Sequence, residues 1–292
     1  MSAALTGSAS SLSLPGKPEG AEGGRVAATL GPRKAAFSQA FSDTSSWGAQ
    51  EGLLRLGVPA LDDALQGGLA LGAVHELAPA SELQLGAALG FGLAVAARAA
   101  TWDRQAGGRQ PTQVLCIQTD YAGLAAGAPY GLGLDGFGLA MEQLLILRIA
   151  HPRDALWAFE EALKCPALAA VVAELPEDGA AADFTATRRL GLAAQKGGGL
   201  GLLLRHRLYP LPSTAMTRWQ IAAAVSAPDR FGGLGATRFD LSLHRNRRGR
   251  GGRWIADWNH DERTFLPQAL SLGMAETARD RSDRARPLLR IA

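Results

Sequence analysis

The chain has 292 residues, of which 47% are hydrophobic, so one or two domains with a sizeable core are expected. The longest apolar stretch, Leu83 to Ala97, is interrupted by glycines and is shorter than the ~20 apolar residues of a membrane span. The chain does not open with a charged segment ahead of an apolar one, so neither a membrane protein nor a secreted one is indicated. Cys116 and Cys165 lie in or beside apolar runs without CxxC spacing, which is typical of reduced core residues in a cytoplasmic protein.

Charge is distributed unevenly along the chain. The net charge is +3, but residues 221–292 carry 13 basic and eight acidic side chains, whereas residues 51–220 carry 13 and 16. An acidic partner would therefore be attracted to the C-terminal quarter. Of the 30 basic residues 26 are Arg, and only Lys17, Lys34, Lys164 and Lys196 are Lys.

Residues 1–50 are rich in Ser, Gly, Ala and Pro and predict a disordered leader with a short helix near Ala35–Phe41. Residues 51–268 predict one domain in which short apolar strands alternate with helices. This alternation indicates an α/β fold with a mostly parallel sheet that is buried on both faces. The expected helices are Val58–Leu65, Ser81–Ala100, Pro152–Lys164 and Asp183–Lys196, and the expected strands are Gly72–Leu77, Thr112–Gln118, Leu144–Ile149, Ala169–Leu175 and Leu200–Arg205.

From about residue 219 the apolar period changes to two. Trp219–Val225, Arg238–Leu243 and Arg253–Trp258 have this strand-like pattern, and a loop rich in Gly and Arg joins the last two. This indicates an antiparallel C-terminal extension of the sheet. Residues 269–292 contain five arginines and predict a flexible basic tail.

The segment from Gly67 to Leu85 resembles the entry to a RecA-like P-loop NTPase core, in which a strand leads through a phosphate-binding loop into the first core helix. A working loop needs glycines, a Lys for the terminal phosphates and a Ser or Thr for magnesium. Leu83, Gln84 and Leu85 stand at the second glycine, the Lys and the Ser/Thr positions, and the chain has no Lys between Lys34 and Lys164. Ser81 and Gln84 instead fit a capping box that starts the helix. We therefore expect no nucleotide cofactor and no enzymatic activity.

Two carboxylates end predicted strands where RecA-like ATPases keep catalytic acids. Asp120 follows the second strand and Glu174 ends the fourth. Both could be remnants of catalysis, but polar residues also commonly end strands where the chain meets solvent, and that interpretation is favoured here. The five histidines show no metal-ligand spacing, so we expect structural or surface roles for them and no metal site.

Arginines form two candidate contact regions for DNA or a protein partner. The loop from His244 to Arg253 suits bidentate phosphate contacts, but it could equally be a solvated hairpin or a docking site for an acidic segment. The segment after the fifth strand could contact single-stranded DNA by charge and by stacking of Tyr209, or could be a plain connector. The candidate arginines are Arg205, Arg207, Arg218, Arg245, Arg247, Arg248, Arg250 and Arg253.

In order and spacing, these motifs resemble the ImuA family of RecA- and SulA-like bacterial proteins. The resemblance runs from about Leu54 to Leu266 and rests on Leu56–Asp62, Gly67–Glu76, Gly201–Arg205, Thr217–Trp219 and Gly252–Trp254. It implies an SOS-induced accessory protein of error-prone translesion synthesis. The implied partners are a Y-family-like polymerase homologue of the ImuB type, an error-prone C-family DNA polymerase and RecA, in a cytoplasm where the protein joins the nucleoid when DNA is damaged. A divergent RecA-family ATPase and a single-stranded DNA-binding module remain the alternatives.

Overall fold

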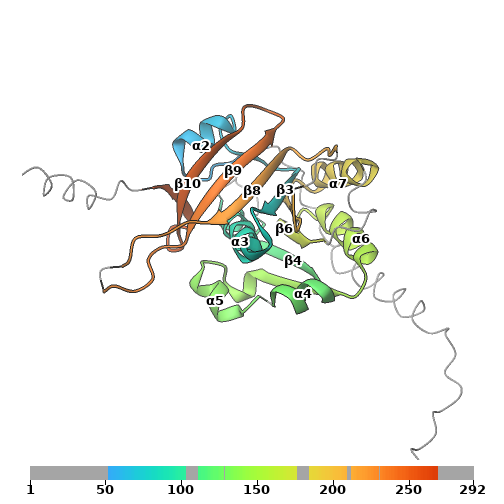
Figure 1. Ribbon diagram of the computed structural model, residues 1–292. Coiled ribbons are helices and arrows are strands. Elements are labelled where there is room, and N and C mark those ends of the chain that lie inside the picture. The colour runs from blue at the N-terminus through green and yellow to red at the C-terminus, as the bar shows by residue number, and fades with distance from the viewer. Residues whose placement is uncertain are drawn as a thin grey trace, which may run out of the picture. The chain divides into compact units, whose positions relative to one another are not determined.

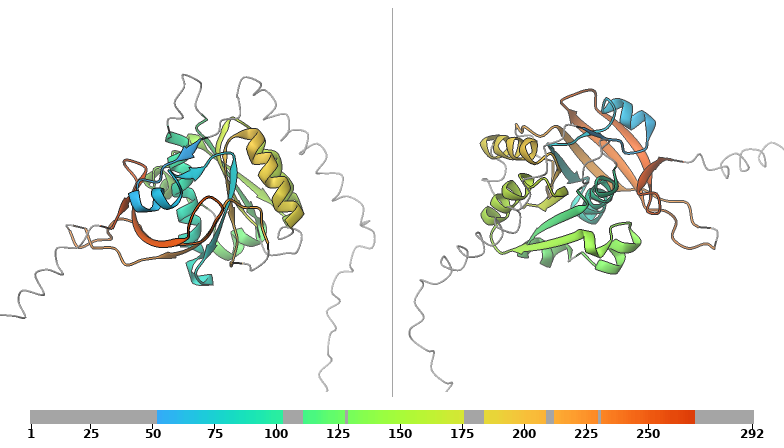
Figure 2. Two further views of the ribbon diagram at one scale, coloured as in Figure 1. Left: turned by 90° about the horizontal axis from the view of Figure 1, so that it is seen from above. Right: turned by 180° about the vertical axis from the view of Figure 1, so that it is seen from behind.

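The computed structural model describes residues 52–102, 111–127, 129–175, 184–208, 212–229 and 231–268. The predicted leader, the helix near Ala35–Phe41, Tyr209 and the basic tail lie outside these residues. Within them a large sheet carries helices on both faces (Figures 1 and 2).

The predicted α/β class is confirmed, and the arrangement is consistent with a RecA-like fold. The described strands of the main sheet lie in the order β11-β10-β9-β8-β3-β7-β6-β4-β5, and β1 pairs with β2 separately. The strands are β1 (Leu53–Leu54), β2 (Leu69–Ala70), β3 (Ala73–Pro79), β4 (Gln113–Thr119), β5 (Leu144–Ile149), β6 (Leu168–Glu174), β7 (Leu200–Leu204), β8 (Thr217–Ala223), β9 (Arg238–Asn246), β10 (Gly252–Asn259) and β11 (Thr264–Pro267).

The start of the antiparallel extension differs from the prediction. Strand β8 runs parallel to β3, with His75 opposite Thr217, and antiparallel to β9 on its other side. The parallel part of the sheet therefore includes β8, and the change of direction comes with β9. The sequence pattern does not predict the end strand β11.

The helices are α2 (Pro59–Ala64), α3 (Leu85–Thr101), α4 (Asp120–Ala126), α5 (Gly131–Gly136), α6 (Pro152–Leu163) and α7 (Phe184–Gly197), with 3-10 turns η2 (Glu82–Gln84) and η3 (Met141–Gln143). Helices α4 and α5 fall in a glycine-rich stretch whose composition favours turns. The other helices lie where the sequence pattern predicts them, except that α3 begins four residues late.

Helix α3 covers one face of the sheet, and α6 and α7 cover the other. The Cα of Gly92 lets α3 approach Leu77 and Val172, while Gly201 leaves room for Leu163 of α6 on the opposite face. The C-terminal strands also contact α3, because the ring of Phe91 in this helix packs against the rings of Trp219, Phe239 and Phe265. Together with η2, α3 reaches the length and apolar composition of a membrane span, contrary to the expectation from its apolar run, yet it packs as a core helix.

Both cysteines are free and buried, as predicted. Burial raises the pKa of the Cys116 thiol to about 12, and the nearby Glu174 adds to the effect. Burial also raises the pKa of Cys165. Neither thiol is therefore prepared to react as a thiolate at neutral pH.

Candidate functional site

The position of the phosphate loop is taken by a short, self-contained turn. After β3 only Ala80 and Ser81 precede η2, and α3 begins directly at Leu85. The predicted capping box is wrong: the Ser81 side chain makes no capping hydrogen bond, and only its carbonyl oxygen accepts from the Gln84 amide, at 2.9 Å. Gln84 is still the third residue after Ser81, but its side-chain oxygen accepts from the Ala223 amide instead of closing the box.

The side chain of Gln84 is hydrogen-bonded to strand β8. Its Oε1 accepts a hydrogen bond of 2.8 Å from the backbone N–H of Ala223, the last residue of β8. The side chain that stands at the Lys position therefore ties the start of α3 to the sheet. Leu83 beside it is 94% exposed and carries no polar group, and Glu82 brings a negative charge to the first turn. This turn offers a phosphate neither a cation nor a wrapped row of amides.

The two candidate acids have different surroundings. Asp120 is exposed at the first turn of α4, as expected for a strand end that meets solvent. Glu174 is only 2% exposed, so the solvent interpretation is wrong for it. Its Oε2 accepts from Gln118 Nε2 at 3.2 Å, and its Oε1 lies 3.4 Å from His206 Nε2. Side chains from β4 and the segment after β7 cover this end of the sheet and keep the carboxylate away from water.

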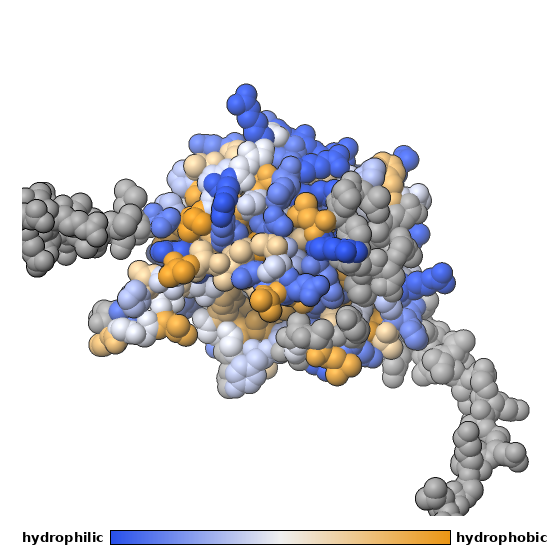
Figure 3. All heavy atoms as spheres, in the orientation of Figure 1, coloured by the Kyte–Doolittle hydropathy of each residue, from blue (hydrophilic) through white to orange (hydrophobic). Residues whose placement is uncertain are grey.

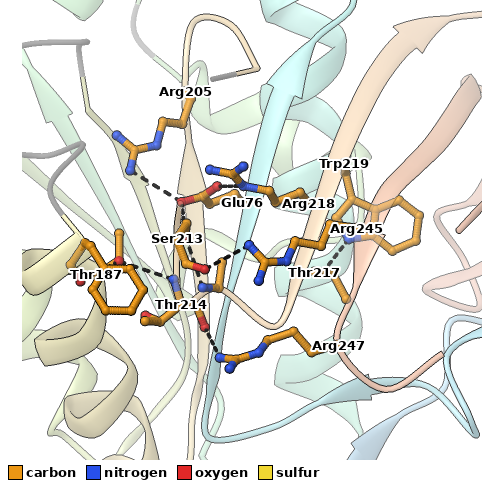
Figure 4. Close-up of polar contacts among 12 residues, drawn as sticks. Glu76, Thr187, Arg205, Ser213, Thr214, Thr217, Arg218, Trp219, Arg245 and Arg247 are labelled. Carbon is orange, nitrogen blue, oxygen red and sulfur yellow. Dashed lines mark hydrogen bonds and ion pairs between the residues drawn. The ribbon is translucent and has the colours of Figure 1, made fainter. Parts of the chain in front are cut away.

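Glu76 is a carboxylate with several polar partners, and the sequence analysis did not identify it as a site residue (Figure 4). It lies inside β3 and is buried. Its Oε1 accepts from Ser213 Oγ at 2.7 Å and lies 3.4 Å from Arg205 Nη2, and its Oε2 accepts from Arg218 Nε at 2.6 Å. We refer to Glu76, Arg205, Ser213 and Arg218 as the Glu76 cluster. It joins β3, β8 and the segment that connects β7 to β8.

This cluster changes the interpretation of two predicted contact residues. Arg205 is 4% exposed, and the side chain of Arg218 is also largely buried against Glu76. Their guanidinium groups neutralise a buried carboxylate, because a charge in the interior needs a partner. The expected surface role in DNA or partner contact thus does not fit Arg205 and Arg218, whereas Arg207 is exposed.

The arginines of the β9–β10 hairpin lie at the surface, but most of them have bonds within the protein. Arg245 Nη1 donates to the carbonyl oxygen of Ser213 at 3.1 Å, and Arg247 Nη1 donates to that of Thr214 at 3.0 Å. Arg248 Nη2 lies 3.4 Å from Gln66 O, and Arg253 pairs with Asp240. Arg250 is exposed at the hairpin tip, where hydrophilic side chains gather in Figure 3. The hairpin therefore holds the 213–214 segment while presenting positive charge to solvent.

His75 has the structural role that was expected of the histidines. It is completely buried, with Nδ1 2.7 Å from Thr217 Oγ1 and Nε2 3.0 Å from Ala70 O. Burial lowers its pKa to about 4, so the ring is neutral at pH 7. Thr217 Oγ1 also accepts from Trp219 Nε1 at 2.7 Å. Among the described residues no group of three or more His, Cys, Asp or Glu could hold a metal ion.

The sequence motifs that carried the family resemblance thus have structural explanations. Side-chain bonds from His75 to Thr217 and from Arg218 to Glu76 tie β3 to β8. Trp219 donates to Thr217 within β8. The motif Leu56–Asp62 at the start of the domain is also structural. The Asp62 carboxylate accepts hydrogen bonds from the backbone amides of Leu56 and Gly57 at 2.8 and 3.0 Å. These residues hold the frame of the domain.

Comparison with known proteins agrees with this pattern of motifs. The chain is 34% identical over 216 residues to Protein ImuA of Caulobacter vibrioides, in strain NA1000 / CB15N and in strain ATCC 19089 / CIP 103742 / CB 15. The match covers 70% of this chain and 82% of each relative. The chain belongs to the ImuA family. No protein-family model matches this ImuA-family chain.

Proposed function

We propose that this ImuA-family protein is a non-catalytic accessory protein of DNA-damage-induced, error-prone translesion synthesis. It acts in the bacterial cytoplasm through contacts with polymerase subunits: a Y-family-like polymerase homologue of the ImuB type, an error-prone C-family polymerase and, in some assemblies, RecA. Family membership supports the link to DNA-damage mutagenesis. The observation that carries the non-catalytic part is the engagement of Gln84 with Ala223 at the phosphate-loop position.

A protein that binds a nucleoside triphosphate must balance the several negative charges of its phosphates with cations or hydrogen-bond donors. The described turn and the start of α3 provide Leu83, Gln84 and Leu85 where a working loop provides a glycine, a Lys and a hydroxyl. The end of α3 still has a weak dipole, worth only about 0.3–1 kcal/mol for an anion. This is too little to position a terminal phosphate for attack.

Nucleotide binding and hydrolysis test the non-catalytic assignment directly. The purified protein is expected to show no binding of ATP with magnesium by calorimetry and no phosphate release above a heat-denatured control. Hydrolysis that disappears in both Gln84→Ala and Glu174→Gln would overturn the assignment in favour of a divergent ATPase. Hydrolysis unchanged by both substitutions would indicate a contaminating enzyme.

Association tests the accessory role. The tagged protein is expected to co-purify with the ImuB-type homologue, the C-family polymerase or RecA when each is co-expressed with it. Failure to associate with all three would refute the accessory role, whatever the nucleotide result.

Single-stranded DNA binding is a second candidate, supported by the exposed arginines of the β9–β10 hairpin. Replacing Arg247, Arg248 and Arg250 by Ala should then weaken binding and reduce the salt slope by about 0.7 for each phosphate that is no longer neutralised. Arg253→Ala is the matched control, since this exposed arginine already pairs with Asp240. Binding that is absent, or that does not depend on salt, would exclude this candidate.

A further inference from the structure

A groove of about 360 Å³ lies between helix α7 and the beginnings of strands β3 and β8. This volume falls in the range of about 300–1,000 Å³ that is typical of binding pockets. Its walls are largely apolar, and two large side chains of α7, Phe184 and Leu192, are 50% and 59% exposed there. We name it the α7 groove, after its lining by Phe184, Arg188, Leu192, Met216 and Arg247 together with the first residues of β3.

The charge of the α7 groove has one sign. Among the described residues, the charged ones that line it are Arg188 and Arg247, and none is acidic. Arg188 belongs to α7, whereas Arg247 lies on the opposite wall, where its Nη1 donates to the carbonyl oxygen of Thr214 (Figure 4). The groove therefore suits a protein segment that combines apolar side chains with carboxylates.

The described part of the chain begins beside this groove. The carbonyl oxygen of Gly52 accepts a hydrogen bond of 2.9 Å from the backbone N–H of Leu71. Leu71 directly precedes Gly72, which lines the groove. Gly72 also lies against the end of α7, because a Cβ at this residue would be 3.6 Å from the Cα of Gln195. The residues ahead of Gly52 therefore enter the domain at one end of the α7 groove.

The segment of residues 41–51 has the composition that the groove requires. It contains two large aromatic residues and two acidic ones and no basic residue; these are Phe41, Asp43, Trp47 and Glu51. Such a segment can bury an aromatic ring against the apolar walls and place negative charge near the two arginines.

The length of chain ahead of Gly52 is sufficient to fill the groove. Trp47 precedes Gly52 by five residues, which span at most about 18 Å. Along α7 the distance from Gln195 back to Arg188 is only about 11 Å. Trp47 can therefore reach the middle of the groove while Gly52 stays bonded to Leu71.

We propose that residues 41–51 of this chain dock in the α7 groove, with Trp47 as the anchor against Phe184 and Leu192. A buried aromatic side chain contributes about 150–250 Å² of contact surface. The short tether gives the segment an effective concentration of roughly millimolar order, so a weak intrinsic affinity is enough for docking. This inference does not depend on the proposed function.

Limited chymotrypsin digestion of the full chain, followed by mass spectrometry, tests whether Trp47 is protected. Cleavage after Trp47 should be at least tenfold slower than in a synthetic peptide of residues 41–55. Leu192→Asp should raise the cleavage rate close to that of the peptide, because it removes an apolar wall and repels the acidic segment. Leu234→Asp is the matched control, at a residue 98% exposed in the β8–β9 connection, and should leave the rate unchanged. Circular dichroism would verify that each variant is folded.

A peptide of residues 41–52 added in trans tests whether the segment occupies this groove. In fluorescence anisotropy, the full-length Trp47→Ala variant should bind the labelled peptide at least tenfold more tightly than the unsubstituted chain, because its own segment no longer fills the site. Adding Leu192→Asp to Trp47→Ala should abolish this binding.

Three results would each overturn the proposal. The first is cleavage after Trp47 at the rate of the free peptide in the unsubstituted chain. The second is protection that Leu192→Asp does not reduce, which would place the segment elsewhere. The third is equal binding of the added peptide, or none, in the unsubstituted chain and in Trp47→Ala.

Discussion

Replacing Glu76 by Ala should destabilise the protein far more than removing an exposed carboxylate. The substitution removes the Glu76 carboxylate from beside the guanidinium groups of Arg205, which is 4% exposed, and Arg218. Removing one partner of a buried ion pair typically costs about 3–5 kcal/mol. Ser213 also loses the acceptor of its 2.7 Å hydrogen bond, a further contribution of about 1 kcal/mol.

Urea unfolding followed by tryptophan fluorescence measures this cost. With a slope of about 2–3 kcal/mol per molar urea, the Glu76→Ala midpoint should fall by more than about 1 M. Asp240→Ala is the matched control, because its partner Arg253 is exposed, and it should change stability by at most about 1 kcal/mol. In a double-mutant cycle Glu76→Ala and Arg218→Ala should be non-additive. Equal midpoints for Glu76→Ala and Asp240→Ala would refute the assignment of a structural charge cluster.

Three further predictions concern other parts of the fold. Burial lowers the pKa of His75 to about 4, whereas the imidazole of the unfolded chain titrates near 6.5. The free energy of unfolding should therefore fall by up to about 3 kcal/mol as the pH drops from about 6.5 toward 4. His75→Gln should flatten that part of a plot of urea midpoint against pH, and an unchanged plot would contradict the burial argument. Gln84→Ala should lower the free energy of unfolding by about 1 kcal/mol, because the hydrogen bond to β8 is lost. Ser81→Ala should lower it by less than about 0.5 kcal/mol, since its side chain caps no helix. Equal losses of stability in urea unfolding would favour the capping box instead. Gly57→Ala should lower the thermal midpoint, because Gly57 has φ +107° and a Cβ would meet a backbone oxygen at 2.5 Å. Gly86→Ala should raise it, because Gly86 lies on the open side of α3, where a Cβ meets no atom within 4 Å. An unchanged midpoint for Gly57→Ala would mean that this turn can relax.

The sequence predicted the parallel core well because its strands are buried on both faces and read as continuous apolar runs. β8 was misassigned for the opposite reason. It is parallel to β3, but its buried and partly exposed residues alternate, and that alternation is the usual mark of an antiparallel strand. Helices α4 and α5 contain glycines at positions where a helical pattern needs side chains, so composition indicated turns instead.

The site was only partly predictable. The loss of the phosphate-binding residues could be read directly from Leu83, Gln84 and Leu85. The Glu76 cluster could not be located, because Arg205 and Arg218 lie 129 and 142 residues from Glu76 in the chain. A signal was nonetheless present: Glu76 stands inside a strand predicted to be buried on both faces, where a carboxylate requires a cationic partner. Residue type alone does not distinguish such a partner from an arginine that contacts DNA.

The position of β3 in the sheet also governs how the chain folds as it is made. Both of its neighbours, β7 and β8, come late in the sequence, so β3 leaves the ribosome with no partner for either side. The 142 residues from Glu76 to Arg218 take on the order of 10 s to synthesise at roughly 5–20 residues per second. During that interval the apolar strand β3 remains unpaired and exposed, which favours aggregation of nascent chains. A lower growth temperature and a supply of chaperones should therefore improve the yield of soluble protein, and chains truncated before Ala223 should not fold.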